Sequence, residues 1–176
     1  AKLYVVDPRK IPLTEIATGH LPLHLGSDVA LFNTMANVII QEGLADLDYI
    51  EKRTEGFEQL KEHLLPFTPE YAEGVTGVPA ELIRECAIAF GSAERAGIYY
   101  TLGITEHICG VSNVQSLCNL ALITGNLGKR SAGINPLRGQ NNIQGAGDCG
   151  ALPNNYPGFQ AVDDPVSQLK FEKAYG

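Results

Sequence analysis

The stretch that decides the fold class is Ile98–Leu102, with the sequence IYYTL. Its β-branched and aromatic residues predict a short buried strand. Gly103–His107 follows the strand, and from Val111 to Thr124 the apolar residues recur at helical spacing. Gly125 then gives this helix a natural end. A buried strand that leads into a helix is typical of an α/β fold.

Two further strand-like segments lie near the N-terminus. Leu3–Val6 predicts a buried parallel strand, and it closes on Asp7-Pro8-Arg9. His20–Leu25 also alternates in polarity, but Pro22 confines it to a sheet edge or an irregular strand. The chain therefore offers strands on both sides of its helical middle.

Helices separate these strands. One amphipathic helix opens at Ser27 or Asp28 and stops at Gly43, and another starts after Thr76–Pro79. Residues 46 to 75 are charged and interrupted by glycine and proline, which predicts short helices on an outer face. The order predicts an α/β domain with αβα layers and a mostly parallel sheet covered by helices on both faces.

In such a sheet the carboxyl ends of the strands share one rim. Asp7 and Leu102–Glu106 would both lie there, where open α/β folds bind their ligands. Neither strand is followed by a G-x-G-x-x-G or a Walker-type lysine loop, so a standard nicotinamide or ATP site is not supported.

The candidate residues also have structural interpretations. Asp7 and Arg9 can simply cap a turn, and Asp28 can cap the helix that it opens, although capping and ligand binding do not exclude each other. His20 and His24 lie beside leucines and are typical of hydrogen-bonded structural histidines.

A stretch of different character follows the α/β pattern. Arg138–Gly150 carries one cation, four carboxamides and four glycines, and almost no apolar surface. Glycine allows close backbone approach, and Asn and Gln need partners when they are buried. The stretch is therefore suited to wrapping a polar ligand, or else it is a solvated loop that is mobile without one. A short polar helix is predicted from Pro165.

Composition limits the classes of function. The chain has 176 residues, 44% of them hydrophobic, and a net charge of -7 without a basic block, which argues against nucleic acid binding. No apolar run is long enough to span a membrane. The first residues show no signal peptide and read as a strand already under way, so we expect a piece of a larger cytoplasmic protein. The four cysteines form no Cys-x-x-Cys pair, so no metal ligands are assigned within this chain.

Several motifs occur in a fixed order, and together they closely resemble the large catalytic subunit of molybdenum- or tungsten-dependent formate dehydrogenases. That family belongs to the bis-molybdopterin guanine dinucleotide oxidoreductases. The resemblance covers essentially the whole chain, and its most specific part is the last motif. The motifs are Asp7–Lys10, Gly26–Asp28, Thr54–Phe57, Gly103–His107, Leu122–Gly128 and Asn135–Gly145.

The resemblance implies a role for each matching residue. Asp7 and Arg9 would contact a guanosine portion of the pterin dinucleotide, and Gly26 and Asp28 its guanine side. Leu102 and Glu106 would lie on the rim that faces the cofactor. Arg138 resembles the arginine that holds formate near the metal, with Gly139 and Gln140 beside the pterin. The residues so assigned are Asp7, Arg9, Gly26, Asp28, Leu102, Glu106, Arg138, Gly139 and Gln140.

The resemblance also implies parts outside this chain. The family carries a [4Fe-4S] cluster and a metal-ligating cysteine or selenocysteine upstream of the first strand, and further domains downstream. We therefore expect residues 1–140 to form part of the cofactor platform, residues 141–176 to begin an adjoining domain, and the chain to be inactive alone. Expected partners are formate, the remaining domains of the subunit and electron-transfer subunits. Two alternatives remain: another molybdopterin oxidoreductase of the nitrate reductase type, or a non-catalytic α/β scaffold.

Overall fold

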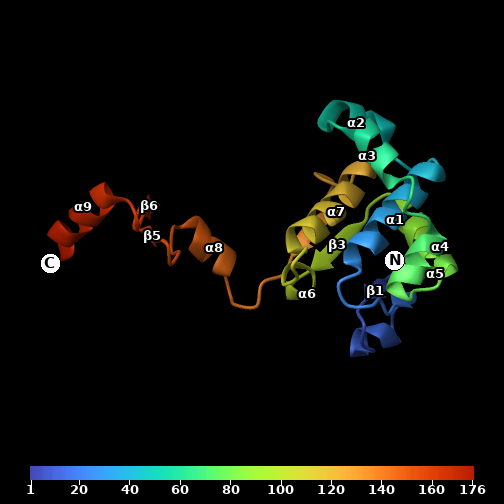
Figure 1. Ribbon diagram of the computed structural model, residues 1–176, viewed down its shortest axis with the longest axis horizontal. Coiled ribbons are helices and arrows are strands. Elements are labelled where there is room, and N and C mark those ends of the chain that lie inside the picture. The colour runs from blue at the N-terminus through green and yellow to red at the C-terminus, as the bar shows by residue number, and fades with distance from the viewer. The chain divides into compact units, whose positions relative to one another are not determined.

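Helix α1 (Asp28–Gln41) is the element against which most of the N-terminal part of the chain packs. The computed structural model describes residues 1–176 and divides into two compact units, Ala1–Pro136 and Leu137–Gly176. The predicted domains change over at residue 140 instead, and that division stays a prediction. The first unit contains, in order, β1 (Tyr4–Val6), η1 (Pro12–Glu15), β2 (Gly19–Leu21), α1, α2 (Leu47–Arg53), α3 (Phe57–Leu64), α4 (Pro69–Thr76), α5 (Ala80–Gly91), β3 (Gly97–Tyr100), α6 (Leu102–Thr105), α7 (Gly110–Ile123) and β4 (Gly133–Pro136) (Figure 1).

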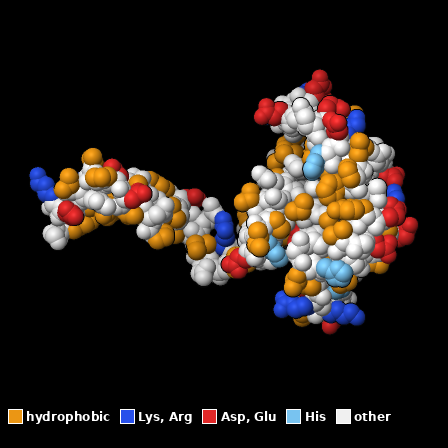
Figure 2. All heavy atoms as spheres, viewed as in Figure 1, with side chains coloured by type: hydrophobic (Ala, Val, Ile, Leu, Met, Phe, Trp, Pro, Cys, Tyr) orange, Lys and Arg blue, Asp and Glu red, His pale blue; other side chains and the backbone are white.

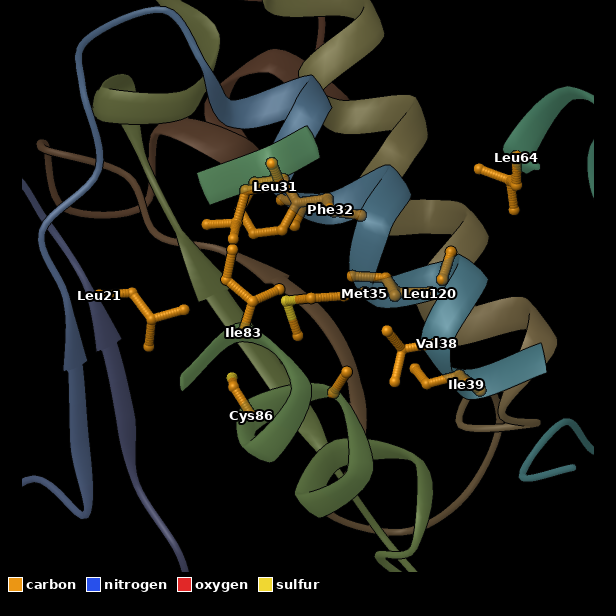
Figure 3. Close-up of a cluster of buried hydrophobic side chains, with 14 of the residues drawn as sticks. Leu21, Leu31, Phe32, Met35, Val38, Ile39, Leu64, Ile83, Cys86 and Leu120 are labelled. Atoms are coloured by element: carbon orange, nitrogen blue, oxygen red, sulfur yellow. The ribbon is translucent and has the colours of Figure 1, made fainter. Parts of the chain in front are cut away.

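The core of this unit lies around α1. Helices α4, α5 and α7 all pack against it, and its apolar side chains meet Ile83 and Cys86 of α5 and Leu120 of α7 (Figure 3). Cys86 is an inert core residue, because burial raises the pKa of its thiol to about 12. Close packing on several sides explains why α1 buries polar residues as well as apolar ones.

Both predicted ends of α1 can be checked against the backbone. Gly26 adopts a φ of 81° just before the helix, and Gly43 a φ of 68° just after it, so the predicted stop is confirmed. The N-cap is Ser27, but its hydroxyl donates back to the His24 carbonyl oxygen at 2.6 Å instead of accepting from the helix. Asp28 is the first helical residue and does not cap α1.

The strands form short parallel pairs. β1 pairs with β2 in the register Tyr4↔Gly19, and β3 pairs with β4 in the register Gly97↔Gly133. The α/β class with parallel strands is thereby confirmed, but the pairs are two separate sheets and not one continuous sheet. Each pair therefore exposes more of its surface than a covered parallel sheet would.

The prediction of a buried strand over Ile98–Leu102 is wrong in two respects. β3 ends at Tyr100, and Leu102 already belongs to α6. Along β3 the exposure alternates, with Ile98 and Tyr100 packed against the core and Tyr99 open to solvent. Alternation of this kind follows from the two-residue period of a strand that is covered on one face only.

The charged segment between α1 and α5 forms three short helices, α2 to α4, as predicted. Acidic and basic side chains gather on the surface over α2 and α3 (Figure 2), where Lys52 pairs with Asp48 and Lys61 with Glu58. These exposed pairs within a helix contribute little to stability, so the charged faces of α2 and α3 are solvated, whereas α4 packs against α1.

The second unit, Leu137–Gly176, is built from short elements. They are α8 (Ile143–Asp148), the antiparallel pair β5 (Asn155–Tyr156) and β6 (Gln160–Ala161), and α9 (Pro165–Tyr175). The predicted helix from Pro165 is confirmed, and Asp164 caps it by accepting from the Ser167 N–H at 3.0 Å. Tyr156 stacks on Phe171 with ring centroids 4.4 Å apart. None of the helices in either unit is long and apolar enough to cross a bilayer.

Candidate functional site

Asp7 and Arg9 lie directly after β1. The Asp7 carboxylate accepts from the Arg9 N–H at 2.8 Å, and the Arg9 Nε lies 3.6 Å from the same oxygen. The Arg9 side chain is 80% exposed and that of Asp7 24%. The turn interpretation and the ligand interpretation are thus compatible: Asp7 shapes the turn, while most of the Arg9 guanidinium remains available to an anionic or polar ligand.

His20 secures this strand end from the neighbouring strand. Its Nε2 lies 2.7 Å from the Asp7 carbonyl oxygen, across the β1–β2 pair. His20 therefore has the structural role that the sequence favoured for it, and it holds the backbone from which the Asp7 side chain projects.

Gly26 and Asp28 form a second part of the site at the start of α1. A Cβ on Gly26 would meet nothing within 4 Å, so the backbone here faces open space, while its φ of 81° favours glycine. Asp28 is only 5% exposed. Burial raises the pKa of its carboxyl, and its own backbone N–H and the nearby His107 charge oppose that rise.

Leu102 and Glu106 lie on and directly after α6. Both side chains are exposed, and the Glu106 N–H donates to the Leu102 carbonyl oxygen at 2.9 Å. His107 follows and places Nε2 3.0 Å from the Gly103 carbonyl oxygen. The charge of His107 acts on Asp28 and lowers the pKa of its carboxyl, so this segment lies within electrostatic range of the start of α1.

His107 is a further candidate site residue. From the sequence it was given no role, although it is the last residue of the Gly103–His107 motif. The signal available in the sequence was a histidine directly after a strand-end motif. What the sequence could not give was its proximity to Asp28, because 79 positions on the chain separate the two residues (107 − 28).

Arg138, Gly139 and Gln140 belong to the second unit. All three are exposed, and the Arg138 Nη2 donates to the Gln144 Oε1 on α8 at 3.2 Å. Gln144 thereby steadies the guanidinium with one contact, and the remaining N–H donors of the fork face outward. Asp7, Arg9, Gly26, Asp28, Leu102 and Glu106 belong to the first unit.

The side chains of the first unit suit a guanine nucleotide. The Asp28 carboxylate is nearly buried and makes no hydrogen bond to another side chain of the chain, and two adjacent N–H donors on a guanine edge would satisfy it. Arg9 supplies a cation for a phosphate, and Gly26 leaves room for close approach. No group of three His, Cys, Asp or Glu side chains gathers in a way that could hold a metal ion.

Polar residues at strand and helix ends of an α/β domain are where open α/β folds bind their ligands. The family model for molybdopterin oxidoreductases matches residues 1–174. The chain belongs to the molybdopterin oxidoreductase family.

Two individual relatives carry the name formate dehydrogenase. The chain is 54% identical over 164 residues to an F420-dependent formate dehydrogenase subunit alpha of Methanocaldococcus jannaschii, covering 93% of this chain and 24% of that protein. It is 50% identical over 176 residues to formate dehydrogenase H of Escherichia coli, covering 100% of this chain and 25% of that protein. The chain thus spans about a quarter of the length of the curated relatives that it matches.

A solved structure supports the fold. Acetylene hydratase from Pelobacter acetylenicus superimposes with a TM-score of 0.72 at 35% sequence identity, over 74% of this chain and 18% of that one. The resemblance to this family, stated from the motifs, is therefore confirmed. The roles of the individual site residues stay predictions.

Proposed function

We propose that this chain is the part of a formate dehydrogenase catalytic subunit that binds a guanosine end of a bis-molybdopterin guanine dinucleotide cofactor and holds formate through Arg138. Identity of about half of all residues to formate dehydrogenase alpha subunits, over nearly the whole chain, supports this proposal. The observation that carries it is Arg138, an exposed guanidinium held by Gln144 within a frame of carboxamides and glycines.

The chemistry of Arg138 suits a small carboxylate. A guanidinium can donate two parallel hydrogen bonds to the two oxygens of formate, which fixes the direction of the C–H bond. Gln144 takes up one Nη2 hydrogen and so limits the rotation of the fork. When bound, the molybdenum or tungsten centre supplies a two-electron acceptor, so that formate can leave as carbon dioxide after losing a proton and two electrons. The orientation of formate by Arg138 lowers the activation barrier of the oxidation, because it restricts the reactants to a productive geometry.

Asp7, Arg9, Gly26 and Asp28 would bind the guanosine end. Asp28 would accept from the guanine N–H donors, and Arg9 would contact a phosphate or ribose oxygen near Asp7. Leu102 and Glu106 would lie on the rim that faces the cofactor, and Gly139 and Gln140 would lie beside the pterin. The [4Fe-4S] cluster, the metal-ligating cysteine or selenocysteine and the electron-transfer subunits belong to the same proposal, as does a cytoplasmic location.

The test is Arg138→Lys in the full-length subunit. Lysine keeps the charge but loses the fork, so kcat/KM for formate with an artificial electron acceptor should fall by at least about tenfold, equivalent to about 1.5–3 kcal/mol of lost transition-state binding. Lys173→Arg, at the exposed end of α9, is a matched control for a Lys/Arg exchange and should leave turnover unchanged. If turnover of Arg138→Lys stays within twofold of the parent, Arg138 does not hold the substrate.

A second candidate function has its own support. The similarity to acetylene hydratase indicates that this α/β platform also occurs in proteins named for reactions other than formate oxidation. Assaying the full-length protein with formate, nitrate and acetylene separates these possibilities, and we expect turnover of formate only. A full-length reading frame without cysteine motifs upstream of this chain would instead favour the non-catalytic scaffold.

A further inference from the structure

Asn113 is a fully buried polar residue at the start of α7. It is 0% exposed, and its carboxamide links the start of α7 to α6. The Nδ2 group donates to the Ile104 carbonyl oxygen on α6 at 2.9 Å, and the Cys109 thiol lies 3.5 Å from the Oδ1 atom. A buried carboxamide with both ends engaged is costly to replace, because each partner would lose its hydrogen bond in the interior.

Helix α6 has little that could order it alone. It consists of four residues, its N-cap Thr101 makes no side-chain hydrogen bond, and Leu102 and Thr105 are exposed. A single turn fixes several dihedral angles for very few hydrogen bonds, so an isolated turn of this length is unstable in water. The order of α6 therefore depends on contacts with the rest of the unit.

Gly110, the first residue of α7, makes the second contact with α6. It is buried, and a Cβ at this position would overlap the Thr105 carbonyl oxygen, so only glycine lets the start of α7 approach α6 this closely. The Gly110 N–H also donates to the His107 carbonyl oxygen at 2.9 Å. Figure 1 shows α6 beside the N-terminal end of α7.

From these contacts we infer that Asn113 and Gly110 form a clamp that positions the cofactor-facing segment Leu102–His107. Both residues act through others. Asn113 holds the Ile104 carbonyl group by a hydrogen bond, and Gly110 leaves the space that the Thr105 carbonyl group occupies, and both carbonyl groups lie between Leu102 and Glu106. The positioning role rests on the proposed function, whereas the clamp rests on the contacts alone.

The test compares two perturbations of the clamp with two matched controls in the full-length subunit. Asn113→Ala removes the carboxamide, and Gly110→Ala pushes the Thr105 carbonyl away. Asn126→Ala removes an equally buried carboxamide at the other end of α7, where it accepts from the Ala96 N–H at 2.9 Å. Gly74→Ala adds a Cβ on α4 that meets nothing within 4 Å.

The rate of amide hydrogen exchange in Leu102–His107 measures directly whether the clamp orders this segment. It should be about tenfold faster or more in Asn113→Ala and in Gly110→Ala, as expected for loss of one buried hydrogen bond, and change less than about twofold in both controls. The guanine nucleotide released on denaturation, per subunit and after extensive dialysis, should fall at least about threefold in the two clamp variants only.

Each result has a defined meaning. Unchanged exchange in Leu102–His107 for both clamp variants, or equal acceleration in Asn126→Ala, would overturn the clamp. Faster exchange with unaltered nucleotide content would overturn the positioning role. If Asn113→Ala does not fold, Gly110→Ala alone decides by the same two measurements. Parent protein that carries no guanine nucleotide would overturn the proposed function and the positioning role with it, while the exchange rates would still decide on the clamp.

Discussion

Asp28 occupies a position where the fold disfavours its charge. Its side chain is nearly buried at the start of α1, burial raises the pKa of the carboxyl above its ordinary value, and the opposing influence of its own N–H and of His107 does not cancel that rise. Groups held in an unfavourable protonation environment are typical of binding and catalytic sites. A ligand that donates two N–H groups would relieve the cost, which is why we assign the guanine end to Asp28.

In the chain without cofactor, the Asp28→Asn variant should therefore be more stable than the parent at neutral pH. A carboxyl with a raised pKa binds its proton more tightly in the folded state, so its contribution to stability is most favourable below the ordinary pKa of 3.8 and is lost as the pH rises through the folded value. Asparagine carries no charge at any of these pH values, so the variant does not lose stability as the pH rises. Thermal unfolding at several pH values should show Tm of Asp28→Asn above the parent at pH 7, with the gap closing towards pH 3.8.

Glu51→Gln is the control for this comparison, because Glu51 is exposed on α2 and makes no ion pair. Its Tm should follow that of the parent at every pH. An Asp28→Asn variant that is less stable than the parent at pH 7 would contradict the assignment of a strained carboxylate. In the full-length subunit the same variant should retain less guanine nucleotide, since stability and binding make opposite demands on this residue.

At the scale of elements, helix boundaries followed from the sequence much better than strand boundaries did. Helix α7 runs from Gly110 to Ile123 where Val111 to Thr124 was predicted, because its apolar spacing and its terminal glycine agree. The strand predicted over Ile98–Leu102 ends at Tyr100 and is covered on one face only, so both its end and its burial were wrong. Strand burial depends on how many strands and helices cover each face, and a local sequence pattern does not contain that information.

The junction between α7 and α2 is held by Gly125 and Asp46. Asp46 caps α2 by accepting from the Tyr49 N–H at 3.0 Å, and its own N–H donates to the Ile123 carbonyl oxygen at 2.8 Å. Gly125 adopts a φ of 60°, and a Cβ there would overlap the Asp46 carboxylate. Two helices therefore share one joint, at which glycine is needed for its conformation and for its lack of a side chain.

Gly125→Ala should destabilise the chain more than Gly43→Ala does. Both replacements place alanine at a positive φ, which costs about 1–2 kcal/mol. Only at Gly125 does the new methyl group also displace the Asp46 cap, which adds about 1 kcal/mol, whereas a Cβ on Gly43 meets nothing within 4 Å. Urea unfolding of the two variants and the parent measures the difference. Equal losses for the two variants would show that Asp46 moves aside without cost.

For the whole molecule, the family and the candidate residues could be predicted from the sequence, but the spatial relation of those residues could not. The motif order pointed to molybdopterin oxidoreductases, and the family match over residues 1–174 confirms it. The separation of the strands into two pairs, the proximity of His107 to Asp28 and the short helix α8 were not predicted. Each depends on contacts between residues far apart on the chain, or on a glycine-rich backbone whose conformation no periodicity specifies.

The two units differ in how much holds them together. The first buries a continuous cluster of apolar side chains around α1, whereas from Leu137 to Gln144 every residue is exposed and α8 contains no buried residue. Ordering one residue costs about 1–2 kcal/mol of backbone entropy. Along Arg138–Gly150 little apolar burial offsets that cost in the chain alone, and a bound pterin with its many polar edges would supply the lacking interactions.

Arg138–Gly150 should therefore exchange its amide hydrogens rapidly in the dilute chain without cofactor, while α7 stays protected. Helix α7 has seven buried residues and packs against α1, so its amides should open only with the whole unit. Mass spectrometry of proteolytic peptides after timed exchange resolves the two segments within one sample. In the full-length subunit with its cofactor, exchange across Arg138–Gly150 should slow markedly. Equal protection of both segments in the dilute chain would mean that the glycine- and asparagine-rich stretch supports itself, and the physical reason for assigning it to ligand binding would fall.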